Sequence, residues 1–154
     1  MLYDDAWAFE HSVDCRVSVE FAWSFWTDVR NWAFDADIES VQIDGLFAPG
    51  TTGSTTSKSS GRVDWQIGEM IGRSAVIEFP LKGAVGRFRW SFEERGEGTR
   101  ITQRCTIAGE AAEQYVRGFA PGLEAGIPDG MTKLCQAMEA AAQRDSAGAE
   151  GFCA

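Results

Sequence analysis

The chain has 154 residues, 44% of them hydrophobic, which is enough for one domain with its own hydrophobic core. Its 14 basic and 23 acidic residues give a net charge of -9 at pH 7. This charge repels a nucleic-acid backbone and an anionic membrane surface alike, so nucleic acid is excluded as an expected partner.

The four cysteines form no C-x-x-C pair, so their spacing predicts neither a zinc site nor a redox motif. We expect Cys15, Cys105, Cys135 and Cys153 to be reduced and mostly buried as small hydrophobic side chains. The N-terminal stretch MLYDDAWAFEHS has two aspartates where a signal peptide is positively charged, and it lacks an apolar run. No apolar segment reaches the roughly 18 residues that span a membrane. The sequence therefore predicts a cytoplasmic protein.

The first structured part of the chain is predicted to be a strand followed by helix. Alternate residues of 7–15 are apolar or histidine, which predicts a half-buried strand with one face made of Trp7, Phe9, His11, Val13 and Cys15. Ser18 is a suitable N-cap for a helix of about three turns, because apolar residues then recur at spacings of three and four. We expect Trp32 and Phe34 on a second short helix or turn.

From residue 39 to 109 the pattern is that of β-strands separated by glycine, proline or charged clusters. The predicted strands are 39–47, 52–59, 62–70, 74–81, 85–94 and 99–108. One side of the sheet is apolar and the other polar, as is common for antiparallel sheets. The stretch APGTTGSTTSKSSG at 48–61 has a Lys-Ser pair but lacks both glycines of a P-loop. We interpret it as a turn that leads into a polar strand.

After Gly109 the hydrophobic period is helical. We expect one helical segment over 111–120 and a second that starts at Pro121 and runs toward Gln143, kinked by Pro128. The apolar stripe of the second segment consists of Leu123, Ile127, Met131, Leu134 and Met138. Residues 145–154 are mostly small and polar. We therefore predict a single domain over 1–144 and a flexible tail over 145–154.

Short motifs occur in a fixed order along these elements: VSVEFAW at 17–23 followed by Asp28 and Trp32, VQIDGLF at 41–47, GTTG at 50–53, FRW at 88–90 and GTRIT at 98–102. Together with the order of the elements, these motifs resemble the START-like, SRPBCC superfamily, and more narrowly its polyketide cyclase/dehydrase and lipid-transport grouping. The resemblance covers roughly residues 7–143 and depends on the order and spacing of the motifs.

This resemblance implies an α+β fold of the helix-grip (START/Bet v 1-like) type. In that fold a curved seven-stranded antiparallel sheet wraps around a long C-terminal helix, and two short helices connect the first two strands. The resemblance also implies a deep cavity between sheet and helix, with the first and last strands as neighbours. His11 would then lie near Gln103 or Cys105 on the cavity face.

The candidate polar residues each have two interpretations. His11 is the only histidine, so a site with two histidine ligands is excluded, and we expect neither a metal nor a cofactor. It is either a buried, hydrogen-bonded side chain or a catalytic acid or base at the cavity wall. Gln103 is either a satisfied core amide or a ligand contact, since a buried amide is costly unless paired. Tyr115 either packs at the surface or places its hydroxyl at the cavity mouth.

The candidate apolar contacts are either core or pocket wall. The predicted ligand-binding set comprises Trp65, Phe88, Trp90 and Phe92 from the sheet and Ile127 and Met131 from the helix, together with Gln103 and Tyr115. Glycines also recur every fourth residue at Gly118, Gly122, Gly126 and Gly130. They either let the helix approach the sheet or leave room for a ligand, although each costs about 1 kcal/mol of helix stability relative to alanine. This cost predicts some mobility at the cavity lid.

The leading functional prediction is binding of a small hydrophobic or aromatic ligand, lipid- or polyketide-like, between the sheet and the C-terminal helix. An alternative is a polyketide cyclase/dehydratase-like enzyme in which His11 transfers a proton. A second alternative is a protein-interaction module, which an exposed apolar patch away from the cavity mouth would favour.

Overall fold

The computed structural model describes the backbone of residues 5–153 and the side chains of residues 5–145. Seven described strands form one antiparallel sheet in the order β1-β7-β6-β5-β4-β3-β2. Along the chain the elements are β1 (Asp5–Cys15), α1 (Val19–Thr27), the 3-10 helix η1 (Val29–Phe34), β2 (Ile38–Ile43), β3 (Thr52–Ser57), β4 (Gly61–Ile71), β5 (Ser74–Leu81), β6 (Ala84–Arg95), β7 (Gly98–Ala108) and α2 (Ala112–Cys153). All the predicted strands and both short helices are therefore confirmed.

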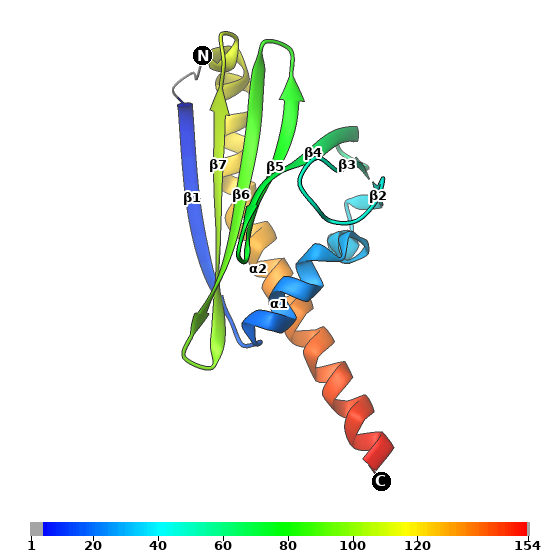
Figure 1. The fold of residues 1–154 in the computed structure, drawn as a ribbon. Helices are drawn as coiled ribbons and strands as arrows, with labels where there is room; N and C mark the ends of the chain where they lie inside the picture. The colour runs from blue at the N-terminus through cyan, green and yellow to red at the C-terminus, as the bar shows by residue number, and fades with distance from the viewer. Residues whose placement is uncertain (1–4, 154) are drawn as a thin grey trace.

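The sheet is strongly curved, and α2 packs against its concave side. Figure 1 shows β1, β7, β6 and β5 standing side by side, while β4, β3 and β2 curl away toward η1. The pairing of β4 with β5 shifts register between Ile67 and Met70. Such a bulge bends a strand and increases its twist, which helps the sheet to curl. This is the helix-grip fold, as expected.

The core lies between the concave face of the sheet, α1 and the middle of α2. Ile101, Cys105 and Ile77 are almost completely buried on the inner face of the sheet. Met131, Leu134 and Met138 come from α2, where spacings of three and four place them on one side. The period-2 alternation of the strands therefore identifies the buried side of the sheet.

The start of α1 follows the predicted capping chemistry. The backbone N–H of Phe21 donates a hydrogen bond to Ser18 Oγ at 3.1 Å, which satisfies one of the free N–H groups of the first turn. Asp28 then accepts from the backbone N–H of Arg30 at 3.2 Å and begins η1. These two caps fix the sharp change of direction between the short helices.

The C-terminal helix is longer and more continuous than predicted. It runs unbroken from Ala112 to Cys153 with Pro121 and Pro128 inside it, so the predicted division at Pro121 is wrong. A proline within a helix removes one hydrogen bond and usually bends the helix without ending it. In Figure 1, α2 changes direction where its colour passes from yellow to orange, the part that contains both prolines.

The helix also continues through the segment expected to be a flexible tail after residue 144. The domain limit at 144 and the flexibility of 145–154 stay predictions. Phe152 and Cys153 lie beyond the described side chains. Among residues 5–153, no helix combines the length and apolar character needed to cross a lipid bilayer.

A disulfide joins Cys15 at the end of β1 to Cys135 on α2. Their Cα atoms are 5.5 Å apart, within the usual range for a disulfide. The prediction of reduced cysteines is therefore wrong for this pair, because motif spacing says nothing about residues 120 positions apart. Cys105 is a free, buried thiol, and burial raises its pKa to about 12. The predicted cytoplasmic location stays a prediction.

Reduction of the Cys15–Cys135 disulfide is expected to lower the free energy of unfolding by about 2–4 kcal/mol, because the unfolded chain regains the entropy that loop closure removes. Urea unfolding with and without a reducing agent measures this effect. A variant with both residues replaced by serine is the control, and its unfolding midpoint should not respond to the reducing agent. A wild-type midpoint that is equally insensitive would show that the two thiols are not linked.

Candidate functional site

A cavity of about 460 Å³ lies between the concave face of the sheet, the short helices and α2. Its volume is within the range of about 300–1,000 Å³ found for small-molecule sites. Trp26, Trp32 and Phe34 line it from the α1–η1 side. The wall on the sheet side is formed by Val63, Ile77, Phe79, Phe88 and Trp90, and the wall on the helix side by Leu123, Ile127, Met131 and Leu134. The lining is thus mainly apolar and rich in aromatic rings.

Trp26 holds the aromatic wall together. It is 2% exposed, and its ring centroid lies 5.7 Å from that of Trp32 and 5.4 Å from that of Trp90. The rings of Phe47, Phe92 and Trp23 lie 5.3, 5.4 and 5.9 Å from that of Trp26. Aromatic rings at such separations attract one another in addition to the area they bury. The wall is therefore a packed cluster that is formed before any ligand enters.

The glycines of α2 leave space in the cavity. Gly122, Gly126 and Gly130 line it at four-residue spacing, and a Cβ atom built on any of them would meet nothing within 4 Å. The sequence left open whether these residues let the helix approach the sheet or leave room for a ligand. The open space around them supports the second interpretation. Gly118 is also unobstructed but does not line the cavity.

The cavity mouth has a polar rim. Asp37 accepts hydrogen bonds from the hydroxyl and the backbone N–H of Ser59, at 2.5 and 3.1 Å, which joins the η1–β2 connection to the β3–β4 turn. Asp35 accepts from the backbone N–H of Asp37 at 2.9 Å. Lys133 on α2 lies 3.9 Å from Asp35 and 3.1 Å from Asp129, and these carboxylates, Asp129 first, raise the Lys133 pKa. The rim is therefore acidic and hydrogen-bonded.

Gln103 is the polar side chain that lies within the cavity wall on β7. It is 7% exposed and lies directly across from His11 on β1 and Trp90 on β6. Its Oε1 atom is buried, and among the described side chains it is the buried polar atom that has no hydrogen-bond partner. An unpaired buried carbonyl is costly. Gln103 is thus a hydrogen-bond acceptor in the cavity wall without a protein donor.

His11 occupies the predicted neighbourhood but does not line the cavity. It pairs with Gln103 in the β1–β7 register, as the resemblance implied, and it is half-buried on the inner face. The helix covers this edge of the sheet. Trp7 Nε1 donates to Glu124 Oε1 at 3.0 Å, and the backbone N–H of Arg16 donates to Glu139 Oε2 at 2.8 Å. The catalytic role of His11 stays a prediction.

The remaining predicted ligand contacts divide into two groups. Phe88, Trp90, Ile127, Met131 and Gln103 come together in the cavity lining. Trp65, Phe92 and Tyr115 lie outside that lining. Whether any of these residues contacts a ligand stays a prediction.

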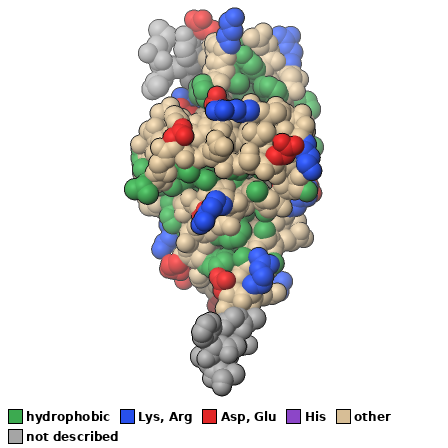
Figure 2. All heavy atoms as spheres, turned by 90° about the vertical axis from the view of Figure 1, so that its right-hand side faces the viewer, with side chains coloured by type: hydrophobic (Ala, Val, Ile, Leu, Met, Phe, Trp, Pro, Cys, Tyr) green, Lys and Arg blue, Asp and Glu red, His purple; other side chains and the backbone are tan. Residues whose placement is uncertain are grey.

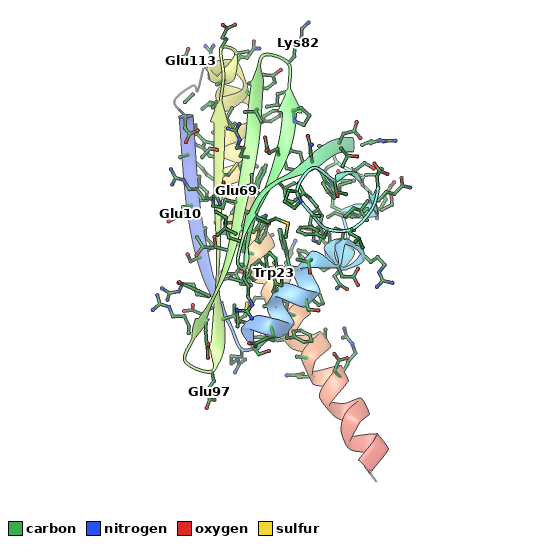
Figure 3. The ribbon with its side chains drawn as sticks, in the orientation of Figure 1. Glu10, Trp23, Glu69, Lys82, Glu97 and Glu113 are labelled. Atoms are coloured by element: carbon green, nitrogen blue, oxygen red, sulfur yellow. A yellow bond between two sulfur atoms is a disulfide. The ribbon has the colours of Figure 1, made fainter. Side chains whose placement is uncertain are left out.

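The three residues outside the lining have other contacts. Trp65 is buried beside Trp32 and donates from Nε1 to Thr55 Oγ1 at 3.0 Å. Phe92 packs against Trp23 of α1 at 5.6 Å. Figure 3 labels Trp23, which lies where α1 meets the sheet, and Lys82 in the β5–β6 turn. The Tyr115 hydroxyl donates to the backbone carbonyl of Lys82 at 3.0 Å and so holds the start of α2 to this turn.

Sequence reasoning missed part of the lining. Ile77 and Phe79 alternate on β5 and could have been assigned to the inner face by their period of two. Trp26 lies among the apolar residues that recur along α1, and it is both core and cavity wall. The rim residues Asp35 and Asp37 carry no sequence signal, because their position depends on the path of a loop. Among the described residues, no cluster of side chains could hold a metal ion.

Comparison with known proteins supports this architecture. The family model described as polyketide cyclase / dehydrase and lipid transport matches residues 6–143. No curated protein matches the chain.

Several solved structures are similar in fold. TTHA0849 from Thermus thermophilus is 15% identical with a TM-score of 0.67, over 87% of this chain and 98% of that one. Norcoclaurine synthase from Thalictrum flavum is 12% identical with a TM-score of 0.68, over 89% and 86%. The di-domain ARO/CYC StfQ of the steffimycin biosynthetic pathway is also 12% identical with a TM-score of 0.68, over 91% and 51%. At these identities the likeness shows the fold, whereas the family model covers most of the sequence, so the chain belongs to the polyketide cyclase/dehydrase and lipid-transport family.

Proposed function

We propose that this protein binds a small, mainly apolar molecule with aromatic character in the cavity between the sheet and α2. The observation that carries the proposal is the 460 Å³ cavity, whose lining is largely aromatic and aliphatic. Glycines at Gly122, Gly126 and Gly130 keep this space open although alanine would stabilise the helix. The family description, which includes lipid transport and polyketide cyclisation, supports the same class of ligand.

Native mass spectrometry of the freshly purified protein, compared with its denatured mass, tests the proposal first. A reproducible extra mass that is lost on denaturation supports a ligand that copurifies. Protein without such a mass is titrated with 2-naphthol and followed by tryptophan fluorescence, because Trp26, Trp32 and Trp90 line the cavity. Saturable quenching at one site supports the proposal. The absence of both a copurified mass and saturable binding contradicts it.

The enzyme alternative has a weaker basis. Norcoclaurine synthase and the ARO/CYC protein share the fold at 12% identity, which carries no information about the residues of this site. A proton donor or acceptor must reach the bound molecule, and His11 lies outside the cavity lining. Among lining residues the ionisable groups are Asp35 and Asp37 at the rim. Binding without turnover is therefore the function that the geometry favours.

The interaction-module alternative depends on an exposed apolar patch. The large hydrophobic side chains described as exposed are Leu46 after β2, Ile71 at the end of β4 and Phe119 on α2, and they come from three different segments. Figure 2 shows the side of the molecule that lies on the right in Figure 1, and charged side chains are scattered singly over it among polar and hydrophobic atoms. These observations favour a small molecule over a protein partner.

A further inference from the structure

We propose that the ligand carries a hydroxyl or N–H group and donates it to Oε1 of Gln103 once the side-chain amide rotates to bring this buried atom to the cavity surface, so that the site selects hydroxylated or amino-substituted aromatic compounds over hydrocarbons. This inference rests on the proposed function and specifies the chemical class of the ligand. It concerns the inner part of the cavity, where aromatic rings surround one unpaired acceptor.

The Gln103 side chain is buried and its carbonyl oxygen is unpaired. It is only 7% exposed, it lines the cavity, and its Oε1 has no partner among the described groups. Its neighbours along the inner face of β7 are Ile101 and Cys105, both fully buried. The Cys105 thiol stays protonated because burial raises its pKa to about 12. Neither these neighbours nor any other described group, His11 opposite it on β1 included, donates a hydrogen bond to the amide oxygen.

Gln103 lies beside the aromatic surface that Trp90 and Phe88 form on β6. Trp90 is its direct partner on β6, and side chains directly opposite in an antiparallel pair have Cβ atoms about 4.5–5.5 Å apart. Phe88, two residues before Trp90 on the same face, extends the aromatic surface. A planar ring system stacked on these side chains can present a substituent at its edge to Gln103. An acyl chain has no such rigid edge.

The cavity extends across the sheet from β4 to β7. Val63 on β4 lines the cavity, and Gln103 on β7 lies three strands farther along the sheet. Neighbouring strands are about 4.8 Å apart, so the separation is at most about 14 Å along the curved sheet. A ligand that contacts both Val63 and Gln103 is therefore extended, whereas a two-ring probe fills only the part of the cavity beside Gln103.

The charge around the cavity limits which ligands can bind. Asp35 and Asp37 lie at the rim, and the whole chain carries a net charge of -9. Lys133 at the rim is already paired with Asp35 and Asp129, so the rim carries a net negative charge. A carboxylate buried beside Gln103 would have only the neutral amide N–H to pair with, which does not offset the cost of removing its charge from water. Free fatty acids and other carboxylates are therefore poor candidates, whereas neutral phenols and aromatic amines satisfy the unpaired acceptor.

The test compares 2-naphthol with 2-methylnaphthalene, which has nearly the same shape but no donor. Dissociation constants are measured by tryptophan fluorescence for the wild type and for Gln103→Met, and the affinity ratio of the two probes is compared between proteins. The free energy of removing each probe from water is the same for both proteins, so it cancels when the two affinity ratios are compared. We expect the preference for 2-naphthol to fall about tenfold in Gln103→Met, because a site that hydrogen-bonds its ligand discriminates against analogues that leave its polar group unpaired.

Two further variants make the result decisive. Gln136→Met is the matched control, since Gln136 is exposed on α2 and lies outside the cavity lining. Gln136→Met should keep the wild-type affinity ratio of the two probes. Gln103→Leu repeats the test with a different apolar side chain, should Gln103→Met not fold. An unchanged ratio in a folded Gln103 variant that binds both probes overturns this inference and leaves the proposed function intact. If neither probe binds the wild type, this inference is overturned, and the proposed function is overturned with it when no extra mass copurifies.

Discussion

Replacement of Trp26 by alanine is expected to lower the free energy of unfolding by about 3–5 kcal/mol, the range for removal of a large buried aromatic side chain. Trp26 is 2% exposed and contacts Trp32, Phe47 and Trp90, so its loss leaves a void between α1, η1 and the sheet. Urea unfolding followed by circular dichroism measures the change.

Leu46→Ala is the control for this experiment. Leu46 is 86% exposed, so its truncation should change the free energy of unfolding by less than about 0.5 kcal/mol. If Trp26→Ala cost no more than Leu46→Ala, the aromatic cluster would not be part of the stabilising core. The cavity wall would then not be preorganised as described.

The second large effect concerns ligand binding. Gly126→Phe is expected to weaken the binding of 2-naphthol at least about 100-fold, or ~2.7 kcal/mol. Gly126 lines the cavity, and apart from its own helix backbone and chain neighbours no described atom lies within 4 Å of a Cβ built on it. A phenyl ring at this position therefore competes with the ligand for space. Fluorescence titration gives the dissociation constant, and the thermal midpoint shows whether the variant is folded. Phenylalanine is a better helix former than glycine, so the helix itself should tolerate the change.

Gly118→Phe is the matched control. Gly118 lies two helical turns before Gly126, is equally unobstructed, and does not line the cavity. The Gly118→Phe protein should retain the wild-type affinity for 2-naphthol. A folded Gly126→Phe protein that binds 2-naphthol as tightly as Gly118→Phe would place the ligand elsewhere.

The strand pattern could be predicted from the sequence because the pleat of a sheet has a fixed period of two. That period places Phe88, Trp90 and Phe92 on the same face of β6. It does not show which of them meets a ligand, because that depends on where another element crosses the strand. In the structure α1 covers Phe92 through Trp23 and Trp26, which leaves Phe88 and Trp90 to line the cavity.

Other features depend on contacts that no local pattern contains. The Cys15–Cys135 disulfide brings together residues 120 positions apart, and the rim depends on the Asp37–Ser59 hydrogen bonds between two loops. The family resemblance placed His11 near Gln103 or Cys105, since strand order does not follow from alternation, and the strand register pairs it with Gln103. The continuity of α2 through Pro121 was missed because the helix is held by packing that outweighs the cost of proline.

The most direct test of the account is to locate a bound probe by NMR. Intermolecular nuclear Overhauser effects are measured between the ring protons of 2-naphthol and the methyl groups of selectively labelled isoleucine and methionine. The account predicts effects to Ile127 and Met131, which line the cavity, and none to the exposed Ile71. Saturable binding with effects to Ile71, and none to Ile127 or Met131, would contradict the claim that the ligand lies between the sheet and α2.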